Sequence, residues 1–483
     1  MSDIEVRGGV GGLSVGLTDL EGSAARLHRV AAEVAEVAAR LTLTGIDPAL
    51  TAAGLLAPLE YLDVERALVP CLGSRGAAGA SADLMATAVA TTAAVRTYRA
   101  GEHAVDALAD GIATGVGEWV GRSAAPFVVG VGVAAVPAAP LVRSVPAARD
   151  AAHAVSLGLG HGLDEMLFDH PWLVPAAADG LDGLILGLGQ GLPVLGLWLA
   201  WRSGRVGVPY PPGTHQEALG VVLAATRGAA LDESGRGLRV RARPTRPGTA
   251  PAGVADLVAA DGPTSGRSRV RVTGIPREDG GWAWVVDVPG TQSFDPRAGA
   301  NPYDLTSNVL LVAGESTLTM QAVVRALEDA RLRVGDAGRS PVMLTGHSQG
   351  GLTAAALAAD PRLRARLGVT HVVTSGAPIA AFDVPDEVSV LSLEHTQDPV
   401  PGLEGANNPD RVNWVTVERS VADDVGPHAR STGAHDNAHY TRTAGIIDAS
   451  DDPSLAAWRA GAAPFIGASG SDAVTTDYDI ERG

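Results

Sequence analysis

The N-terminal part of the chain contains two stretches in which apolar residues recur at a helical spacing. The first runs from about Thr18 to Leu41 and the second from about Ser81 to Leu108, and alanine fills many of the positions between. Steps of three and four residues are typical of a coiled-coil seam. The sequence therefore predicts two long helices that form a hairpin, packed on itself or on a partner. The expected seam positions are Leu20, Leu27, Val34 and Leu41, with Val30 and Val37 between them, and Leu84, Ala88, Thr91, Val95 and Tyr98.

Two uncharged runs follow, Ser123–Val142 and Gly183–Trp201. Each is close to the roughly 20 residues that a helix needs to cross a bilayer. The second run ends in Trp198 and Trp201 beside Arg202, a combination typical of a membrane interface. Prolines and glycines interrupt both runs and weaken them as continuous helices. Two interpretations stay open: membrane contact through residues 123–142 and 183–201, or burial of both runs in a helical bundle.

The pattern changes at a segment rich in glycine and proline, Ser203–Thr214, which we interpret as a linker. Beyond it, apolar residues alternate with arginine over Leu238–Ala242. Two further apolar runs, one near Val270 and one from Trp282, flank the pair Asp279-Gly280, which favours a tight hairpin turn. The second part of the chain is therefore predicted to begin with antiparallel strands.

Strands then alternate with helices. Helical spacing covers Ser316–Ala330, the apolar run Val342–Leu344 indicates a buried strand, and a further strand pattern covers Val369–Ser375. This alternation predicts a mostly parallel sheet with helices on both faces. The expected fold class is therefore α/β, preceded by an α-helical N-terminal domain.

Three parts are expected along the chain. Residues 1–204 form the α-helical domain, of which the Gly-rich residues 1–16 are expected to be loose. Residues 205–448 form the α/β domain. From residue 449 to residue 483 the sequence is mainly polar and acidic, and it is expected to be a C-terminal tail.

Composition narrows the functional classes. Of the 483 residues, 46% are hydrophobic, which indicates a globular or membrane-contacting chain rather than a disordered one. The 37 basic and 54 acidic residues give a net charge of −17, which argues against nucleic acid as a partner. The single cysteine, Cys71, excludes an internal disulfide and a multi-cysteine metal site. The first residues lack the basic and apolar segments of an ordinary secretory signal peptide.

The segment Pro341–Gly351 reads PVMLTGHSQGG and places Ser348 in a G-x-S-x-G pattern. A predicted buried strand precedes the serine, and a helical stretch rich in alanine and leucine, Leu352–Leu367, follows it. A serine between glycines at a strand-to-helix turn is typical of a nucleophile elbow. The glycines let the strand and the helix pass closely, and the turn directs the backbone N–H of Gln349 toward the reacting carbonyl. Ser348 is therefore the candidate nucleophile.

The other members of a serine triad would follow in the order acid, then histidine. Asp398 stands just after a strand pattern at Val388–Leu393, where active sites of α/β sheets gather. Its expected role is to orient a histidine and to stabilise the imidazolium. Three histidines follow it in a polar stretch, namely His428, His435 and His439.

An oxyanion hole needs a second backbone donor, from the loop after an earlier strand. The loop Pro289-Gly290-Thr291-Gln292 follows the strand pattern Trp282–Val288. Gly290 allows close approach of the backbone, and Thr291 offers a hydroxyl besides its N–H. Thr291 and Gln349 are therefore the candidate oxyanion-hole residues.

Residues from about 268 to 445 resemble the class 3 (fungal-type) lipases and related bacterial α/β-hydrolases. The resemblance implies an α/β-hydrolase sheet and hydrolysis of a carboxylic ester or lipid through an acyl-enzyme, with neither a metal nor a cofactor. It does not cover the long N-terminal region. The matching features are the G-[ST] loop at Gly290-Thr291, GHSxGG at Gly346–Gly351, GxP at Gly376–Pro378, D-x-V-P at Asp398–Pro401, and a histidine shortly before Tyr440.

The resemblance also bears on the choice of base. In these hydrolases the histidine stands on a loop a few residues before an aromatic residue that begins a helix, and His435 lies five residues before Tyr440. His439 adjoins Tyr440 at the expected helix start, where the positive end of the helix dipole disfavours a protonated imidazole. We therefore expect His435 to be the base, with His439 as the first alternative and His428 as the second.

Residues 18–108 loosely resemble the N-terminal helical domains of type VII (ESX-type) secretion substrates. Tyr98 and Glu102 match the Y-x-x-x-[DE] motif of those proteins, whereas W-x-G occurs at Trp119-Val120-Gly121, after Tyr98 instead of between the helices. The resemblance implies a secretion-machinery or other helical partner for residues 18–108. It also implies a secreted or envelope-associated protein without a signal peptide, the alternative being a cytoplasmic one.

Two functions are therefore expected of the whole chain. The first is a serine esterase or lipase that uses Ser348, Asp398 and His435. The alternative is a secreted or envelope-associated interaction protein in which the hydrolase fold is an inactive scaffold. The order of serine, acid and histidine along the chain favours the first.

Overall fold

The computed structural model describes residues 4–483 except 46, 73–75, 145–166, 172, 265, 337–339, 426–430 and 468–471. Its contacts divide the chain into two compact units, Leu13–Leu108 and a larger one of Met1–Gly12 with Ala109–Gly483. The division therefore falls near residue 108 and not at residue 204 as expected. The reason is that the short helices between residues 173 and 226 pack on the α/β part of the chain.

The smaller unit is a helical hairpin. Helix α1 (Leu13–Gly45) lies beside the first part of α4 (Ala77–Ser144), and α2 (Pro48–Leu56) and α3 (Pro58–Leu72) stand between them in the chain. The Ser81 hydroxyl donates to the carbonyl of Ala31 at 2.7 Å, and Arg99 pairs with Glu21 at 2.9 Å. Among the described helices, the stretch Ala77–Gly101 has the length and apolar composition of a membrane-crossing segment.

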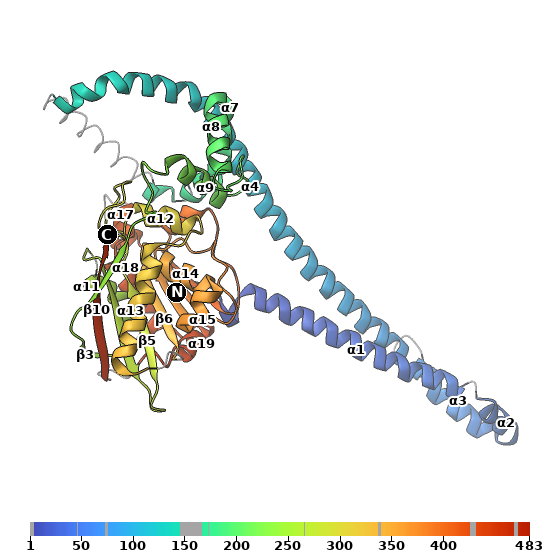
Figure 1. Ribbon diagram of the computed structural model, residues 1–483. Coiled ribbons are helices and arrows are strands. Elements are labelled where there is room, and N and C mark those ends of the chain that lie inside the picture. The colour runs from blue at the N-terminus through green and yellow to red at the C-terminus, as the bar shows by residue number, and fades with distance from the viewer. Residues whose placement is uncertain are drawn as a thin grey trace. The chain divides into compact units, whose positions relative to one another are not determined.

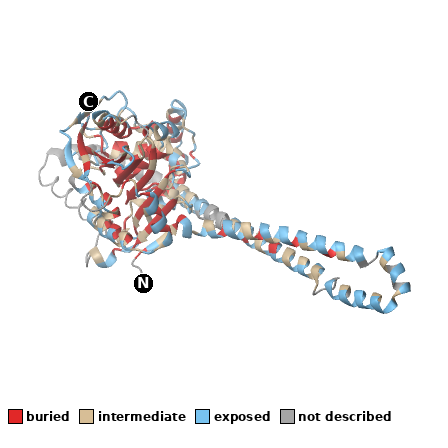
Figure 2. Ribbon diagram, turned by 90° about the horizontal axis from the view of Figure 1, so that it is seen from below, coloured by how far each residue is buried: buried red, intermediate tan, exposed pale blue. Residues whose placement is uncertain are grey.

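The hairpin seam has the predicted period, but its innermost residues are smaller than expected. Leu17, Ala24, Ala31 and Ala38 are buried at seven-residue intervals on α1, and Ala88 and Val95 on α4. Alanine at these positions lets the two helices approach closely, and Leu27, Val34 and Leu41 flank the seam half-buried. The expectation was wrong for Leu20, Val30, Val37 and Tyr98, which are exposed. Figure 2 shows how much of this unit faces solvent.

The larger unit contains a sheet of ten described strands, in the order β1-β9-β8-β7-β6-β5-β4-β10-β2, with β3 also paired to β10 (Figure 1). Strands β5 to β9 are parallel to one another, whereas β1 at one side and β4, β10, β2 and β3 at the other are antiparallel to their neighbours. The predicted mixed α/β class with a mostly parallel sheet is thereby confirmed. The strands are β1 (Glu5–Gly8), β2 (Leu238–Ala242), β3 (Arg246–Thr249), β4 (Arg269–Pro276), β5 (Trp282–Val288), β6 (Val342–His347), β7 (Val369–Ser375), β8 (Ser389–His395), β9 (Trp414–Arg419) and β10 (Asp472–Arg482).

Helices cover both faces of the sheet, as expected. One face packs against α12 (Leu305–Val312), α13 (Leu318–Val334), α14 (Gln349–Ala359) and α15 (Pro361–Leu367), and the other against α10 (Val254–Ala259), α18 (Asn437–Asp448) and α19 (Pro453–Gly461). The buried residues of these two cores are among those coloured red in Figure 2. Shorter helical segments are η1 (Gly9–Gly11), α11 (Asp261–Thr264), η2 (Pro401–Glu404), α16 (Ala422–Val425) and α17 (Ser431–Ala434).

Both ends of the sequence belong to the sheet, which corrects two expectations. Residues 449–483 are not a tail, because α19 packs on the sheet and β10 lies between β4 and β2. The acidic side chains of β10 are neutralised across strands: Asp477 pairs with Arg271 at 2.8 Å, and Asp479 with Arg243 at 2.9 Å. At the opposite edge, β1 pairs with β9, so the first residues are not uniformly loose.

Four helices, α6 (Leu173–Asp179), α7 (Leu181–Gly191), α8 (Pro193–Gly204) and α9 (His215–Thr226), lie in the chain before β2. Helix α6 packs on η2 and α9 packs on α12. Helix α7 crosses α4 closely, since a Cβ added at Gly183 would lie 1.9 Å from the carbonyl oxygen of Thr114. The glycines of this run therefore permit helix packing.

The uncharged run 183–201 does not form one continuous helix. It divides between α7 and α8 at Leu192, where Pro193 begins the second helix. Ile185 and Leu199 pack in a small core with Ala218 and Val221 of α9. The other run, 123–142, continues the backbone of α4, and its side chains lie outside the described residues.

Candidate active site

Ser348 occupies a strained turn between β6 and α14. Its backbone has φ 54° and ψ −122°, a conformation that a residue with a side chain rarely adopts. The preceding strand is completely buried up to Gly346, and the helix begins at Gln349. The turn thus places a serine with strained backbone at the carboxyl end of a central parallel strand.

The glycines around Ser348 are required by close packing. A Cβ at Gly346 would lie 2.3 Å from the carbonyl carbon of Gly350, and a Cβ at Gly350 would lie 2.0 Å from the carbonyl oxygen of Val288. Real Cβ atoms almost never lie less than 3.0 Å from a neighbouring heavy atom of this kind. The G-x-S-x-G spacing therefore reflects the approach of β6, α14 and the end of β5 to one another.

Asp398 and His435 form a hydrogen-bonded pair. The Nδ1 atom of His435 lies 2.7 Å from Oδ2 of Asp398, and the Tyr440 hydroxyl donates to the same oxygen at 2.6 Å. The Val400 amide donates to the other carboxylate oxygen at 2.9 Å. Burial by itself raises the pKa of Asp398, but His435 and these hydrogen bonds lower the pKa below its ordinary value. Asp398 is therefore a carboxylate at neutral pH.

The structure places His435, and not His439, against the acid. His439 lies half-buried in the first turn of α18, where its Nδ1 contacts Arg442 at 3.3 Å. His428 lies outside the described residues. The loop before α18 thus has the register that was expected from the position of Tyr440.

Gly376 joins the serine turn to the acid and histidine pair. The Ser348 amide donates to the carbonyl of Ser375 at 2.9 Å. At the next residue, a Cβ would lie 2.9 Å from Oδ2 of Asp398 and 3.0 Å from Nδ1 of His435. Gly376 also has φ +58°, which favours glycine. The absence of a side chain here lets the three candidate residues gather at the carboxyl ends of the central parallel strands.

The Ser348 hydroxyl itself makes no hydrogen bond to any residue that the structure describes. In particular, no hydrogen bond joins the Ser348 hydroxyl to His435, whose ring is bonded to Asp398. Hydrogen bonds between a nucleophile and its base are often long in the absence of substrate.

His347, directly before the serine, was not among the candidates from the sequence. Its Nε2 donates to the carbonyl oxygen of His435 at 2.9 Å, and the two rings lie 4.4 Å apart. Burial, followed by the nearby His435, lowers the pKa of His347 to about 3. A neutral imidazole at this position therefore holds the loop that carries His435.

A second buried histidine, His395, supports the same loop from β8. Its Nδ1 lies 2.9 Å from the carbonyl oxygen of Ala434, and its Nε2 lies 2.9 Å from the Thr443 hydroxyl. Its ring stacks on Tyr440 at 3.7 Å. Burial lowers the pKa of His395 to about 4. Together the two histidines fix the backbone on either side of His435.

The loop after β5 passes beside the serine turn. A Cβ at Gly290 would lie 3.0 Å from the carbonyl oxygen of His347 and 3.5 Å from Cβ of Ser348. The next residue, Thr291, accepts a hydrogen bond through its hydroxyl from the Asn308 side chain at 2.9 Å. On the other side, the N–H of Gln349 belongs to the first turn of α14 and has no partner within that helix. Both expected oxyanion-hole residues therefore stand next to Ser348.

A buried ion-pair network lies behind this loop. The Arg482 side chain is fully buried and contacts Oδ2 of Asp304 at 2.5 Å and Oε2 of Glu233 at 2.6 Å. The carbonyl of Asp304 accepts from the Gln349 side chain at 3.1 Å. Asp304 also begins α12, the helix that carries Asn308. Arg482 is thus connected to both sides of the candidate oxyanion hole.

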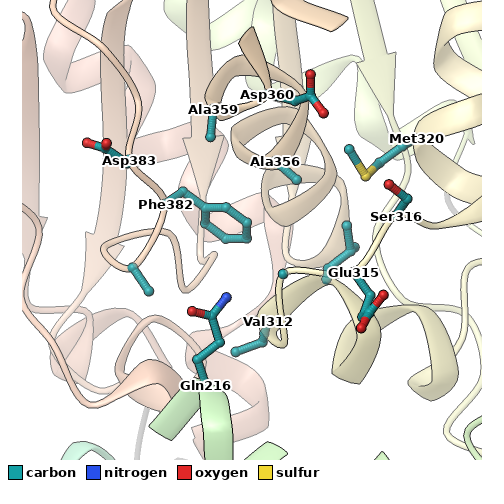
Figure 3. Close-up of a pocket in the computed structure, with 13 residues that line it drawn as sticks. Gln216, Val312, Glu315, Ser316, Met320, Ala356, Ala359, Asp360, Phe382 and Asp383 are labelled. Carbon is teal, nitrogen blue, oxygen red and sulfur yellow. The ribbon is translucent and has the colours of Figure 1, made fainter. Parts of the chain in front are cut away.

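Two cavities lie away from Ser348. One of about 270 Å³ is lined by the ends of α12 and α14, the start of α13 and the loop at Phe382, with Gln216 projecting into it (Figure 3). It borders Ala359, at the opposite end of α14 from Ser348. A second of about 810 Å³ has a mainly apolar lining from residues 112–120 of α4, helices α6 and α7, and the loop 405–407, with Asp179 and Asn407 as its polar members. Among the described residues, no cluster of three or more His, Cys, Asp and Glu side chains could hold a metal ion.

No known protein family, no curated protein and no solved structure matches the chain. The arrangement of residues around Ser348 therefore carries the functional argument by itself.

Proposed function

We propose that the larger unit is an α/β-hydrolase and that the protein hydrolyses carboxylic esters through a covalent acyl-enzyme. The observation that carries the proposal is the contact at Gly376. This residue links Ser348, through the carbonyl of Ser375, to the hydrogen-bonded pair of Asp398 and His435. The positive φ of Ser348 supports the same interpretation, because a strained backbone at a strand-to-helix turn is typical of the nucleophile in this fold.

In the proposed reaction, the Ser348 oxygen attacks the ester carbonyl while His435 takes the hydroxyl proton. Asp398 accepts a hydrogen bond from Nδ1 of His435, which leaves Nε2 free to receive that proton. His435 then gives the proton to the leaving alcohol as the bond between carbonyl carbon and alcohol oxygen breaks. A water molecule, deprotonated by His435, releases the acid from Ser348 in the second half of the cycle.

Negative charge develops on the carbonyl oxygen during each attack. The N–H groups of Gln349 and Thr291 are the proposed donors to this oxygen. Gln349 adds the positive end of the α14 dipole, since it is the first residue of an eleven-residue helix. Asn308 fixes the Thr291 hydroxyl and so restricts the orientation of that residue.

The large apolar cavity supports a substrate with an apolar chain. Its loop 405–407 directly follows η2, which begins three residues after Asp398. Helix α6, which lines the cavity, packs on η2. A mainly apolar cavity in contact with the segment after the acid suits a lipid ester better than a small polar one.

The alternative is an interaction protein with an inactive hydrolase fold. The observation that favours it is the Ser348 hydroxyl, which is not bonded to His435. In either case we propose that the hairpin within residues 18–108 binds a helical or secretion-machinery partner and that the protein is secreted or associated with the cell envelope. The apolar residues left exposed beside the narrow seam support such a partner.

The test is steady-state hydrolysis of p-nitrophenyl esters of graded chain length by the wild type and by the variants Ser348→Ala, His435→Ala and His439→Ala. The proposal expects measurable turnover that Ser348→Ala and His435→Ala reduce by about 10⁴-fold or more, with His439→Ala close to the wild type. If no ester is turned over, the inactive scaffold is the better account.

A further inference from the structure

Helix α8 presents an apolar stripe to solvent. Val194 is 83% exposed, Leu197 74%, Trp198 41% and Trp201 55%. Their spacing of three, one and three residues places all four on one face of the helix. A surface helix normally carries polar residues on its outer face, so a continuous stripe of this kind indicates an interaction surface.

The stripe is held outward by packing on the other face of the same helix. Leu195, Leu199 and Ser203 point inward, and Leu199 joins the small core with α7 and α9. The Arg202 side chain donates from Nε to the carbonyl of Ala224 at 2.9 Å and from Nη2 to that of Arg227 at 3.0 Å. The helix therefore cannot roll to bury the stripe without breaking these contacts (Figure 1 shows α7, α8 and α9 grouped together).

Two arginines stand beside the tryptophans of the stripe. Helix α8 contains no acidic residue, although the chain carries a net charge of −17. The Arg202 guanidinium lies 6.0 Å from the Trp198 ring, and that of Arg205 lies 5.2 Å from the Trp201 ring. Tryptophan beside arginine at the end of an apolar helix matches the composition of a bilayer interface.

We propose that α8 docks the protein on the surface of an anionic lipid bilayer. The helix has twelve residues, well below the roughly 20 that span a bilayer, and it is separated from α7 by a break at Leu192. It therefore lies in the plane of the interface, with the stripe among the acyl chains and Arg205 at the lipid phosphates. Membrane contact through residues 183–201 is thus peripheral and does not require a spanning helix. The inference does not depend on ester hydrolysis.

The experiment is flotation of the full-length protein with vesicles of phosphatidylcholine, alone or with about one-third phosphatidylglycerol. The wild type is expected to bind the anionic vesicles, and added salt is expected to weaken binding. The double variant Val194→Asp/Leu197→Asp is expected to bind at least about tenfold more weakly, because both exposed side chains lose their transfer into the acyl region. Arg205→Gln is expected to reduce the salt dependence.

The matched control is Leu332→Asp, a substitution of a 79% exposed leucine on α13. It should float like the wild type, as should Ser348→Ala, which separates docking from the proposed chemistry. Equal flotation of the double variant and the wild type, or no binding of the wild type to anionic vesicles, would overturn the proposal. So would a dimer in size-exclusion chromatography that the double variant dissociates while vesicles remain unbound, because the stripe would then be a protein interface.

Discussion

Arg482 and Asp304 form a buried ion pair at 2.5 Å although 178 residues separate them in the chain. Burial alone would lower the pKa of Arg482, but Asp304 and Glu233 raise it above its ordinary value. The pair ties the last strand of the sheet to the start of α12. Through the carbonyl of Asp304 it also reaches the Gln349 side chain at the elbow. The strand that was expected to be a tail is therefore connected to the candidate oxyanion hole.

Arg482→Met should destabilise the protein and slow catalysis together. The substitution leaves Asp304 and Glu233 buried without a counter-charge, which costs about 3–5 kcal/mol. Urea unfolding of the variant and the wild type measures the change in stability, and kcat on a short ester measures the change in catalysis. Arg239→Met, which removes a 74% exposed partner of Glu481, is the control and should change stability by about 0–1 kcal/mol. Equal effects of the two substitutions would show that Arg482 has no special role.

Gly376→Ala should reduce kcat/KM by about 10²-fold or more, because the new Cβ would collide with Asp398 and His435 and displace the pair. The positive φ adds about 1–2 kcal/mol of backbone strain. Gly335→Ala is the matched control: its φ is +73° and nothing lies within 4 Å of the added Cβ. That variant should lose similar stability and keep its activity. An active Gly376→Ala variant would mean that the pair does not need this close contact.

Asn308→Ala should lower kcat by about tenfold and leave KM nearly unchanged, because the Thr291 hydroxyl loses its hydrogen-bond donor. The measurement is a double-mutant cycle of Asn308→Ala with Thr291→Ala. If both act through one contact, the double variant should be little worse than either single variant. Additive losses would contradict the link between them.

His371→Phe should change the pH dependence of stability. His371 is buried on β7 against the ring of Phe465, 5.0 Å away, and burial lowers its pKa to about 4. The unfolded chain therefore binds a proton at higher pH than the folded chain does. The contribution of His371 to the free energy of unfolding is fully present above pH 6.5. It is lost as the pH falls from about 6.5 to about 4, by about 1.4 kcal/mol per pH unit.

Unfolding free energies of wild type and His371→Phe, measured across this window, test the point. The variant should lose less stability on acidification, and the difference between the two unfolding free energies should no longer change with pH above about 6.5. Parallel curves throughout the window would show that His371 takes up its proton equally in both states.

The serine turn and the positions of the acid and the histidine could be predicted from short stretches of the sequence. Gly346, Ser348 and Gly350 stand close enough in the chain for their spacing to specify the turn. Asp398 and the loop with His435 were placed from a strand end and a helix start. The mixed α/β class was predicted from the alternation of strands and helices, whereas the assignment to the α/β-hydrolases stays a prediction.

The remaining parts depend on pairing between distant segments. β10 reads as polar because Asp477 and Asp479 stand in it, and only their partners Arg271 and Arg243 on other strands make it compatible with the sheet. The role of Arg482 could not be predicted either, because its partners Asp304 and Glu233 lie far from it in the chain. The run 183–201 is apolar on all sides, so hydropathy could not separate the buried face of α8 from the exposed one.

In the proposed function, Ser348 is a nucleophile activated by His435 and Asp398. The most direct test of this proposal is reaction of the full-length protein with a fluorophosphonate, followed by intact mass measurement and mapping of the modified peptide. We expect one adduct, located on Ser348, that forms more slowly in Asp398→Asn and is absent from Ser348→Ala. An unlabelled wild type, or an adduct that persists in Ser348→Ala, would contradict it.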